Sequence, residues 1–146
     1  IKQADVLLLM TRLPELFTPE EKAAAWEDFE PLCLHDSSLS FATHALFAAQ
    51  NGPADAAERY WEKALWLDLR DIMGNTGKEG LHLACLGETW QTLVFGFAGL
   101  HLTPDGPALA PHLPERWRSL SFRFTHRGRS YEARVSRDEP TELIAR

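Results

Sequence analysis

The sequence predicts a mainly α-helical protein that ends in a small β-sheet module, and three observations lead to this fold class. Apolar residues recur at helical spacing through the first two-thirds of the chain. After residues 96–99 they alternate at the period of two that is typical of strands. Between the two patterns, residues 103–107 are rich in turn-forming Pro, Asp and Gly. We therefore expect helices to give way to strands near residues 99–107.

The helix expected after residue 18 has a well-defined start. Thr18 is a good N-cap residue, Pro19 suits the first helical position, and Glu21 stands where it completes a capping box. Trp26 and Phe29 then follow at roughly helical spacing. The segment is therefore predicted to become helical at Pro19.

A second start signal is the pair Ser37-Ser38, which precedes the apolar, Ala-rich segment 41–49. Serine commonly caps a helix at this position. The same helix should end at Gly52 and Pro53, because Gly is favoured just past a helix end and Pro cannot continue the helix.

Two more helices are expected, over residues 54–70 and 81–95. The first carries a broad apolar stripe and should therefore lie between neighbouring elements. The second is apolar apart from a few residues, and we expect it to be deeply buried. The stripe of the first helix consists of Ala57, Tyr60, Trp61, Ala64, Leu65, Trp66, Leu67 and Asp68.

The strand pattern begins at residues 119–124, where polar and apolar residues alternate. A turn is expected over residues 126–129, and the alternation returns over 131–135, so the two segments should form a β-hairpin. The tail, residues 138–146, should add one short strand.

The composition excludes several classes of protein. The chain has 146 residues, a net charge of −6 and a pI near 5.5, and so lacks the basic surface of a nucleic-acid-binding domain. No apolar run approaches the roughly 18 to 20 residues that cross a membrane. The start of the chain does not have the pattern of a signal peptide. We therefore expect a cytoplasmic protein without nucleic-acid or membrane partners.

The two cysteines, Cys33 and Cys85, both lie beside apolar residues. Reduced thiols in the core are expected for a cytosolic protein, although a disulfide between them stays open at this point. The Cys and His residues show no spacing typical of a zinc site, so no metal ligand is assigned from the sequence.

Three polar segments each precede an apolar run that is expected to be helical. They are Lys2-Gln3, Ser37-Ser38 and the glycine-bearing segment 74–82, which ends in His82. A helix N-terminus attracts anions, because its free N–H groups and the helix dipole both point at them. If the helices pack side by side in the same sense, the three starts meet at one rim and form a pocket of phosphate size. The alternative is that the two serines are simple helix caps.

Several motifs follow one another along essentially the whole chain. They are Ile1-Lys2-Gln3, Phe29-Glu30-Pro31, His35-Asp36-Ser37-Ser38-Leu39-Ser40, Gly80-Leu81-His82, Thr89-Trp90, Gly96-Phe97-Ala98-Gly99 and Leu113-Pro114. In this order they resemble the C-terminal third of glycoside hydrolase family 65, which contains inverting phosphorylases for maltose, trehalose, kojibiose and nigerose. Leu86 and Glu88 depart from the pattern, since the family usually carries a small residue and glycines at this place.

The resemblance implies a fold and an activity. Residues 1–98 would be the last part of an (α/α)6 catalytic barrel, and residues 99–146 part of a C-terminal β-sheet domain. Inorganic phosphate would cleave an α-linked glucose disaccharide to β-glucose 1-phosphate and glucose. The partners would then be a disaccharide and phosphate, with no cofactor, and a homodimer is usual among similar full-length proteins.

The same resemblance assigns roles to individual residues. Lys2, Ser37, Ser38 and His82 would bind phosphate, and Lys2 and Gln3 would lie next to the sugar. The general acid of the family is a glutamate upstream of the Lys-Gln motif. No catalytic residue is therefore expected among these 146 residues, and the chain alone should be inactive.

Two other interpretations stay open at this point. A trehalase-like hydrolase of the same family would use water in place of phosphate. A non-catalytic interpretation is a fragment that binds an anion or a carbohydrate. Such a fragment would expose an apolar helix face and should self-associate.

Overall fold

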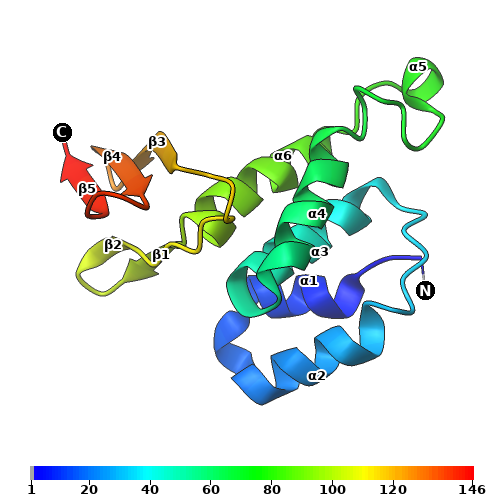
Figure 1. The fold of residues 1–146 in the computed structure, drawn as a ribbon, viewed down its shortest axis with the longest axis horizontal. Helices are drawn as coiled ribbons and strands as arrows, with labels where there is room; N and C mark the ends of the chain where they lie inside the picture. Colours follow the sequence, from blue (N-terminus) through cyan, green and yellow to red (C-terminus); the bar gives the residue numbers. More distant parts are fainter. Residues whose placement is uncertain (1) are drawn as a thin grey trace.

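The computed structural model describes residues 2–146, and Ile1, the first residue of the Ile1-Lys2-Gln3 motif, lies outside the described residues. Within them the helices are α1 (Asp5–Arg12), α2 (Pro19–Phe29), α3 (Ser38–Asn51), α4 (Ala54–Leu65), α5 (Thr76–Glu79) and α6 (Leu83–Gln91). A 3-10 helix, η1 (Pro14–Leu16), follows α1, and a π-helical segment, η2 (Thr92–Phe97), continues α6. The strands are β1 (Leu100–Thr103), β2 (Gly106–Leu109), β3 (Ser119–His126), β4 (Arg129–Ser136) and β5 (Glu142–Ala145). The predicted order of helices and then strands is confirmed (Figure 1).

The predicted capping box at the start of α2 is confirmed in full. The backbone N–H of Glu21 donates to the Thr18 hydroxyl at 3.2 Å, and the N–H of Thr18 donates to the Glu21 carboxylate at 2.8 Å. Pro19 occupies the first turn, as predicted. All three features depend on neighbouring residues only, which explains why the sequence alone predicts them.

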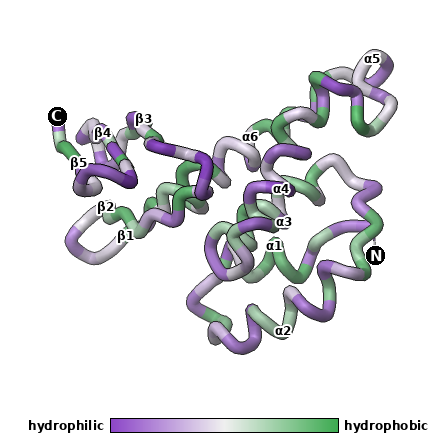
Figure 2. The backbone as a smooth tube through the Cα atoms, viewed as in Figure 1, coloured by the Kyte–Doolittle hydropathy of each residue, from purple (hydrophilic) through white to green (hydrophobic). Residues whose placement is uncertain are grey.

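Helix α3 is the centre of the helical layer. Every residue from Ser40 to Ala49 is buried, because α1, α4, α6 and η2 pack around the helix. Small residues on α3 let these neighbours come close. A Cβ added to Gly96 in η2 would lie only 2.7 Å from the Cβ of Ala49. Most residues of α1 are hydrophobic, whereas hydrophilic residues recur along α2 (Figure 2).

Helices α1, α3 and α6 run in the same sense. Thr43 in α3 donates to Glu88 in α6 at 2.8 Å, and Ala49 further along α3 packs on Gly96 beyond α6. At its start α1 lies beside the start of α3, and at its end Arg12 donates to Glu88 at 3.0 Å. Figure 1 shows the three helices beginning on one side of the molecule, and α4 running in the opposite direction. The same-sense packing required by the predicted pocket is therefore present.

Two predicted helices differ from the structure in length. The helix expected over residues 54–70 ends at Leu65, and the chain then forms turns up to residue 73. The turns after Leu65 are held by contacts with the segment that follows, since the carboxylates of Asp71 and Asp68 accept hydrogen bonds from the backbone N–H groups of Thr76 and His82. The helix expected over 81–95 begins at Leu83 and becomes π-helical at Thr92.

The expected deep burial of the second of these helices is wrong on one face. Cys85, Glu88 and Thr89 are buried against the core. Leu83 and Trp90, on another face of α6, are 73% and 50% exposed. Within the described residues this apolar face is therefore only partly covered, with the Phe95 ring against Trp90.

The strands form two small antiparallel sheets. In the first, β1 pairs with β2. In the second the order is β3-β4-β5, with Phe122 opposite Ala133 and Ala133 opposite Leu143. The predicted hairpin over residues 119–135 and the short strand in the tail are thus confirmed.

Aromatic packing joins the β-module to the helices. The Trp117 ring lies 4.9 Å from the Trp61 ring in α4 and 5.1 Å from the Phe97 ring in η2, both at steep angles that suit edge-to-face contact. Next to it, Arg116 forms ion pairs with Glu58 and Glu62 at 2.9 and 2.7 Å. The segment before β3 is therefore held against the side of α4.

Both cysteines are free thiols, as expected. Cys33 is half-buried in the loop between α2 and α3, and Cys85 is buried in α6. Burial raises the pKa of the Cys85 thiol to about 11. Among the described residues, no helix has both the length and the apolar character to cross a membrane.

Candidate functional site

The start of α3 carries the two serines predicted to bind phosphate. Ser37 is the N-cap residue and Ser38 the first helical residue, but the Ser37 side chain forms no capping hydrogen bond. The predicted alternative, a simple serine cap, is therefore not formed in its usual way. Both hydroxyls lack a hydrogen-bond partner among residues 2–146, and the first N–H groups of α3 point out of the helix beside them.

The start of α1 lies next to these serines. Gln3 and Ser37 line the same small cavity, of about 30 Å³, together with Ser40 and Thr43 of α3. Gln3 itself is exposed. The structure therefore brings Gln3 next to Ser37, whereas Ser38 does not line this cavity.

Lys2 is exposed at the beginning of the described chain. No hydrogen bond or ion pair joins it to another residue between 2 and 146. It does not line the cavity of Gln3 and Ser37. Its ammonium group is thus free to move toward an anion at this end of the helices, but the structure does not hold it there.

His82 stands at the start of α6 and is fixed by Asp68. The backbone N–H of His82 donates to Asp68 Oδ2 at 2.9 Å, and His82 Nδ1 lies 2.6 Å from Asp68 Oδ1. The His82 side chain is 17% exposed and that of Asp68 4%. With Nδ1 engaged, Nε2 is the ring nitrogen left for a ligand.

The electrostatics of this pair follow from its hydrogen bonds. Burial acts to raise the pKa of Asp68, but the hydrogen bonds from His82 and Thr76 outweigh it and hold that pKa below its ordinary value. Asp68 is therefore ionised at neutral pH. The sequence analysis placed Asp68 on the apolar stripe of a helix, and a lone carboxylate among apolar residues was the signal that could have identified it.

A second polar cluster joins the loop between α2 and α3, which precedes the two serines, to α4. Tyr60 of α4 donates to the Glu30 carboxylate at 2.5 Å, and its hydroxyl is 3.3 Å from His35 Nε2. His35 Nδ1 lies 2.7 Å from the Ser40 hydroxyl. Burial, and next the nearby His44 and Lys63, lower the pKa of His35 to about 4. These contacts fix the backbone just before Ser37 and Ser38.

A buried carboxylate links α6 to its neighbours. Glu88 accepts hydrogen bonds from Thr43 at 2.8 Å and from Arg12 at 3.0 Å. Burial raises the pKa of Glu88, although Thr43 and Arg12 oppose the change. Glu88 thus joins the three helices whose starts carry the candidate site, and its role in the described residues is to hold them together.

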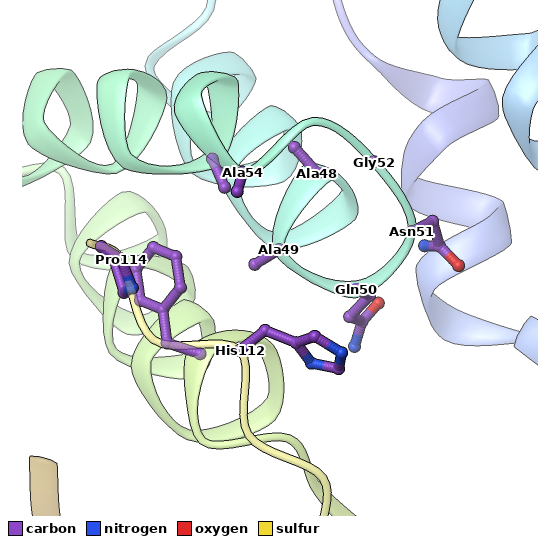
Figure 3. A pocket seen from close by; sticks show the side chains of 10 residues that line it. Ala48, Ala49, Gln50, Asn51, Gly52, Ala54, His112 and Pro114 are labelled. Carbon is purple, nitrogen blue, oxygen red and sulfur yellow. The ribbon is translucent and has the colours of Figure 1, made fainter. Parts of the chain in front are cut away.

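A larger cavity, of about 220 Å³, lies at the far end of α3 from the serines. Its walls are mostly small residues at the end of α3 together with Pro114, and the His112 ring points toward Gln50 (Figure 3). None of the residues predicted to bind phosphate lines it. We therefore assign the candidate site to the helix starts and not to this cavity.

Comparison with protein families matches two adjoining parts of the chain. Residues 1–91 match the family model described as "Glycosyl hydrolase family 65 central catalytic domain". Residues 100–141 match "Glycosyl hydrolase family 65, C-terminal domain".

The curated relatives include several phosphorylases. The kojibiose phosphorylase of Caldanaerobacter subterraneus subsp. tengcongensis is 39% identical over 95% of this chain and 18% of its own length. An α,α-trehalose phosphorylase of Thermoanaerobacter brockii is 36% identical over 94% of this chain and 18% of its own length. The 1,2-α-glucosylglycerol phosphorylase of Bacillus selenitireducens is 35% identical over 97% of this chain and 19% of its own length. The chain therefore spans about a fifth of the length of these relatives.

A solved structure supports the same relationship. It is assigned as a kojibiose phosphorylase from the human microbiome, and it superposes with a TM-score of 0.88 at 31% sequence identity. The match covers 100% of this chain and 20% of that chain. From the family models, the relatives and the shared fold together, the chain belongs to glycoside hydrolase family 65.

Proposed function

We propose that this chain is the C-terminal part of an inverting disaccharide phosphorylase. In this proposal inorganic phosphate is the co-substrate and no cofactor takes part. Phosphate attacks an α-linked glucose disaccharide and gives β-glucose 1-phosphate and glucose. The names of the relatives, which are phosphorylases of kojibiose, trehalose and glucosylglycerol, support this class of reaction.

The observation that carries the proposal is the common direction of α1, α3 and α6. Because these helices run in the same sense, the segments that carry Gln3, Ser37 and His82 all stand at helix starts on one side of the helical layer. Two features there suit an anion: hydroxyl groups without a partner in the described chain, and the first N–H groups of a 14-residue helix.

Each residue has a distinct task in this proposal. Ser37 and Ser38 donate hydrogen bonds to phosphate oxygens without adding charge, so the phosphate keeps its nucleophilicity. His82 donates from Nε2, with the ring held in place by Asp68. Lys2 swings in from the surface and supplies a positive charge. Gln3 binds the sugar next to the bond that is cleaved.

Inversion requires the proton donor to lie on the face of the sugar opposite the phosphate. We propose that this donor is a glutamate outside these 146 residues. The buried Glu88 is not a substitute, because its carboxylate is already bonded to Thr43 and Arg12. The isolated chain is accordingly expected to be inactive.

The test uses the full-length protein that carries this chain. It is supplied with kojibiose, trehalose or glucosylglycerol, with and without phosphate, and the anomer of the product is identified by NMR. We expect cleavage only with phosphate, and β-glucose 1-phosphate as the product. Ser38→Ala and Lys2→Ala should each raise the KM for phosphate about tenfold or more, the effect of losing a charge-assisted hydrogen bond.

Ser119→Ala is the matched control, since Ser119 is an exposed serine of β3 far from the helix starts. It should leave the KM for phosphate unchanged. Cleavage at the same rate without phosphate would instead identify a hydrolase. Unchanged phosphate dependence in both Ser38→Ala and Lys2→Ala would contradict the proposed site.

A further inference from the structure

Three side chains with metal-binding atoms meet beside the candidate phosphate site. Cys33 and His35 come from the loop between α2 and α3, and His44 comes from α3. One ligand atom from each residue lies within 4.8 Å of the other two. Cys33 and His35 are half-buried and His44 is fully buried, so the cluster lies inside the molecule but near its surface. The spacing along the sequence is unlike that of common zinc motifs, which explains why sequence analysis did not predict it.

His44 is already oriented like a metal ligand. Its Nδ1 lies 2.8 Å from the backbone carbonyl oxygen of Ser40, to which it donates. Its Nε2 is buried and has no hydrogen-bond partner among residues 2–146. A buried polar atom without a partner costs about 1–3 kcal/mol. Histidines that bind metals commonly donate their other ring N–H to a carbonyl in this way.

The loop residues are held close together by Ser40. The Ser40 hydroxyl lies 2.7 Å from His35 Nδ1 and 3.1 Å from Cys33 Sγ. His35 has a φ of 54°, in the left-handed region that non-glycine residues seldom adopt. Packing against Phe41, with 4.9 Å between ring centroids, keeps it there. The backbone of His35 thus adopts an unfavourable conformation, which places its imidazole beside the Cys33 thiol.

We propose that Cys33, His35 and His44 bind a thiophilic divalent cation, Zn²⁺, with water as the fourth ligand. On binding, the Cys33 thiol releases its proton to solvent and forms a thiolate–zinc bond, and each imidazole gives a nitrogen lone pair. Sulfur and imidazole nitrogen are the donors that zinc prefers in proteins. Ligand atoms around a tetrahedral zinc lie about 3.5 Å apart. The loop therefore closes on the metal by roughly 1 Å, and the Ser40 hydroxyl gives up its contacts with Cys33 and His35.

The site has a consequence for the loop that it belongs to. The chain passes from His35 to Ser37 and Ser38 with one residue between them. Zinc that pins Cys33 and His35 to α3 will also restrict the two serines. A change in the KM for phosphate on zinc binding is therefore expected. This consequence rests on the proposed function, whereas the binding of the metal does not.

The test is a titration of the full-length protein with Co²⁺, a coloured substitute for Zn²⁺. We expect visible bands of tetrahedral Co²⁺, a near-ultraviolet thiolate-to-cobalt band, and loss of both when Zn²⁺ is added. Cys33→Ser should abolish the thiolate band. His44→Gln should weaken binding by about 10- to 100-fold. Cys85→Ser and His101→Gln, which change residues outside the cluster, should leave the titration as in the parent.

A second measurement covers the case in which a variant does not fold. The rate of alkylation of Cys33 in the parent protein is followed by peptide mass spectrometry, with and without Zn²⁺. Zinc should slow the reaction at Cys33 and leave the buried Cys85 unchanged. An equal rate at Cys33 with and without zinc, or a parent titration identical to that of Cys33→Ser, would overturn the zinc site. Neither readout depends on phosphate or on catalysis.

Discussion

Asp68 and His82 are joined by two hydrogen bonds, one from the His82 backbone N–H at 2.9 Å and one from His82 Nδ1 at 2.6 Å. The carboxylate thereby sets both the position of the backbone at the start of α6 and the orientation of the imidazole. A ring fixed through Nδ1 presents Nε2 to a ligand. Asp68 is thus a positioning residue for the proposed phosphate contact.

The first prediction concerns Asp68→Asn. The two hydrogen bonds from His82 go to different oxygens of Asp68. In an amide an NH₂ group, which only donates, replaces one of these oxygens, so one of the two bonds is lost and the ring loses its fixed orientation. We expect the KM for phosphate to rise by about 10- to 100-fold, the effect of a hydrogen bond to a charged group. Steady-state kinetics at varied phosphate concentration measure the change.

Asp55→Asn is the matched control, because the Asp55 side chain in α4 is 80% exposed. A double variant separates positioning from a general loss of structure. In a His82→Gln background, Asp68→Asn should have little additional effect on the KM for phosphate. Equal effects of Asp68→Asn with and without His82 would show that the carboxylate does not act through the imidazole.

The second prediction compares two glycines with positive φ. Gly99 connects η2 to β1 at φ 62°, and a Cβ there would lie 1.9 Å from the carbonyl oxygen of Ala110. Gly128 in the β3–β4 turn has φ 75° with open space around it. Gly128→Ala should cost about 1 kcal/mol of stability, whereas Gly99→Ala should cost several times more because the backbone must move. Urea denaturation measures both, and similar losses would contradict the close approach at Gly99.

The third prediction concerns acid stability. Burial lowers the pKa of His35 from 6.5 to about 4, so between these values the unfolded chain binds a proton that the folded chain does not. Stability should therefore fall as the pH drops from 6.5 toward 4. His35→Asn removes this contribution, and Asn tolerates the left-handed φ at this position. The unfolding midpoint of His35→Asn should drop less between pH 7 and pH 4.5 than that of the parent.

His101→Asn serves as the control for this measurement, because His101 is exposed on β1. It should lose stability with acid as the parent does. His44, whose pKa is also lowered by burial, contributes in the same direction and should leave a residual acid sensitivity in His35→Asn. An acid loss in His35→Asn equal to that of the parent would refute the prediction.

The fourth prediction concerns the open face of α6. Leu83, Leu86 and Trp90 lie three and four residues apart and are 73%, 39% and 50% exposed. The isolated 146-residue chain should therefore bind hydrophobic dyes and self-associate. Replacing Leu83 and Trp90 by Lys should reduce both effects, whereas Leu102→Lys in β1 should not. Light scattering after size-exclusion chromatography gives the result, and a monodisperse parent without dye binding would disprove it.

The sequence predicted those parts of the fold that neighbouring residues determine. The capping box of Thr18 and Glu21 and the turn before Arg129 depend on residues a few positions apart, and both have the expected form. The end of α4 was misjudged, because Asp68 turns the chain through a bond to His82, which is distant in the sequence. Burial of α6 was overestimated for a similar reason, since hydropathy does not say what covers each face.

The candidate site shows the same division. The segments with Gln3, Ser37 and His82 could be chosen as helix starts from local patterns. Their meeting at one end depends on the direction in which the helices pack, which required the structure. The orientation of His82 by Asp68 and the cluster of Cys33, His35 and His44 are contacts between separate elements. Such contacts cannot be predicted from the spacing of residues along the sequence.

Because the proposed site is built from the starts of α1, α3 and α6, its geometry depends on the tertiary packing of these helices. Its residues come from segments that meet only when Thr43 and Arg12 close on Glu88. A partly folded chain could keep all three helices and still hold the serines and His82 apart. If phosphate binds at the proposed site, its retention would report on the assembly of the helical layer, and a partly folded chain with full helix content would release it.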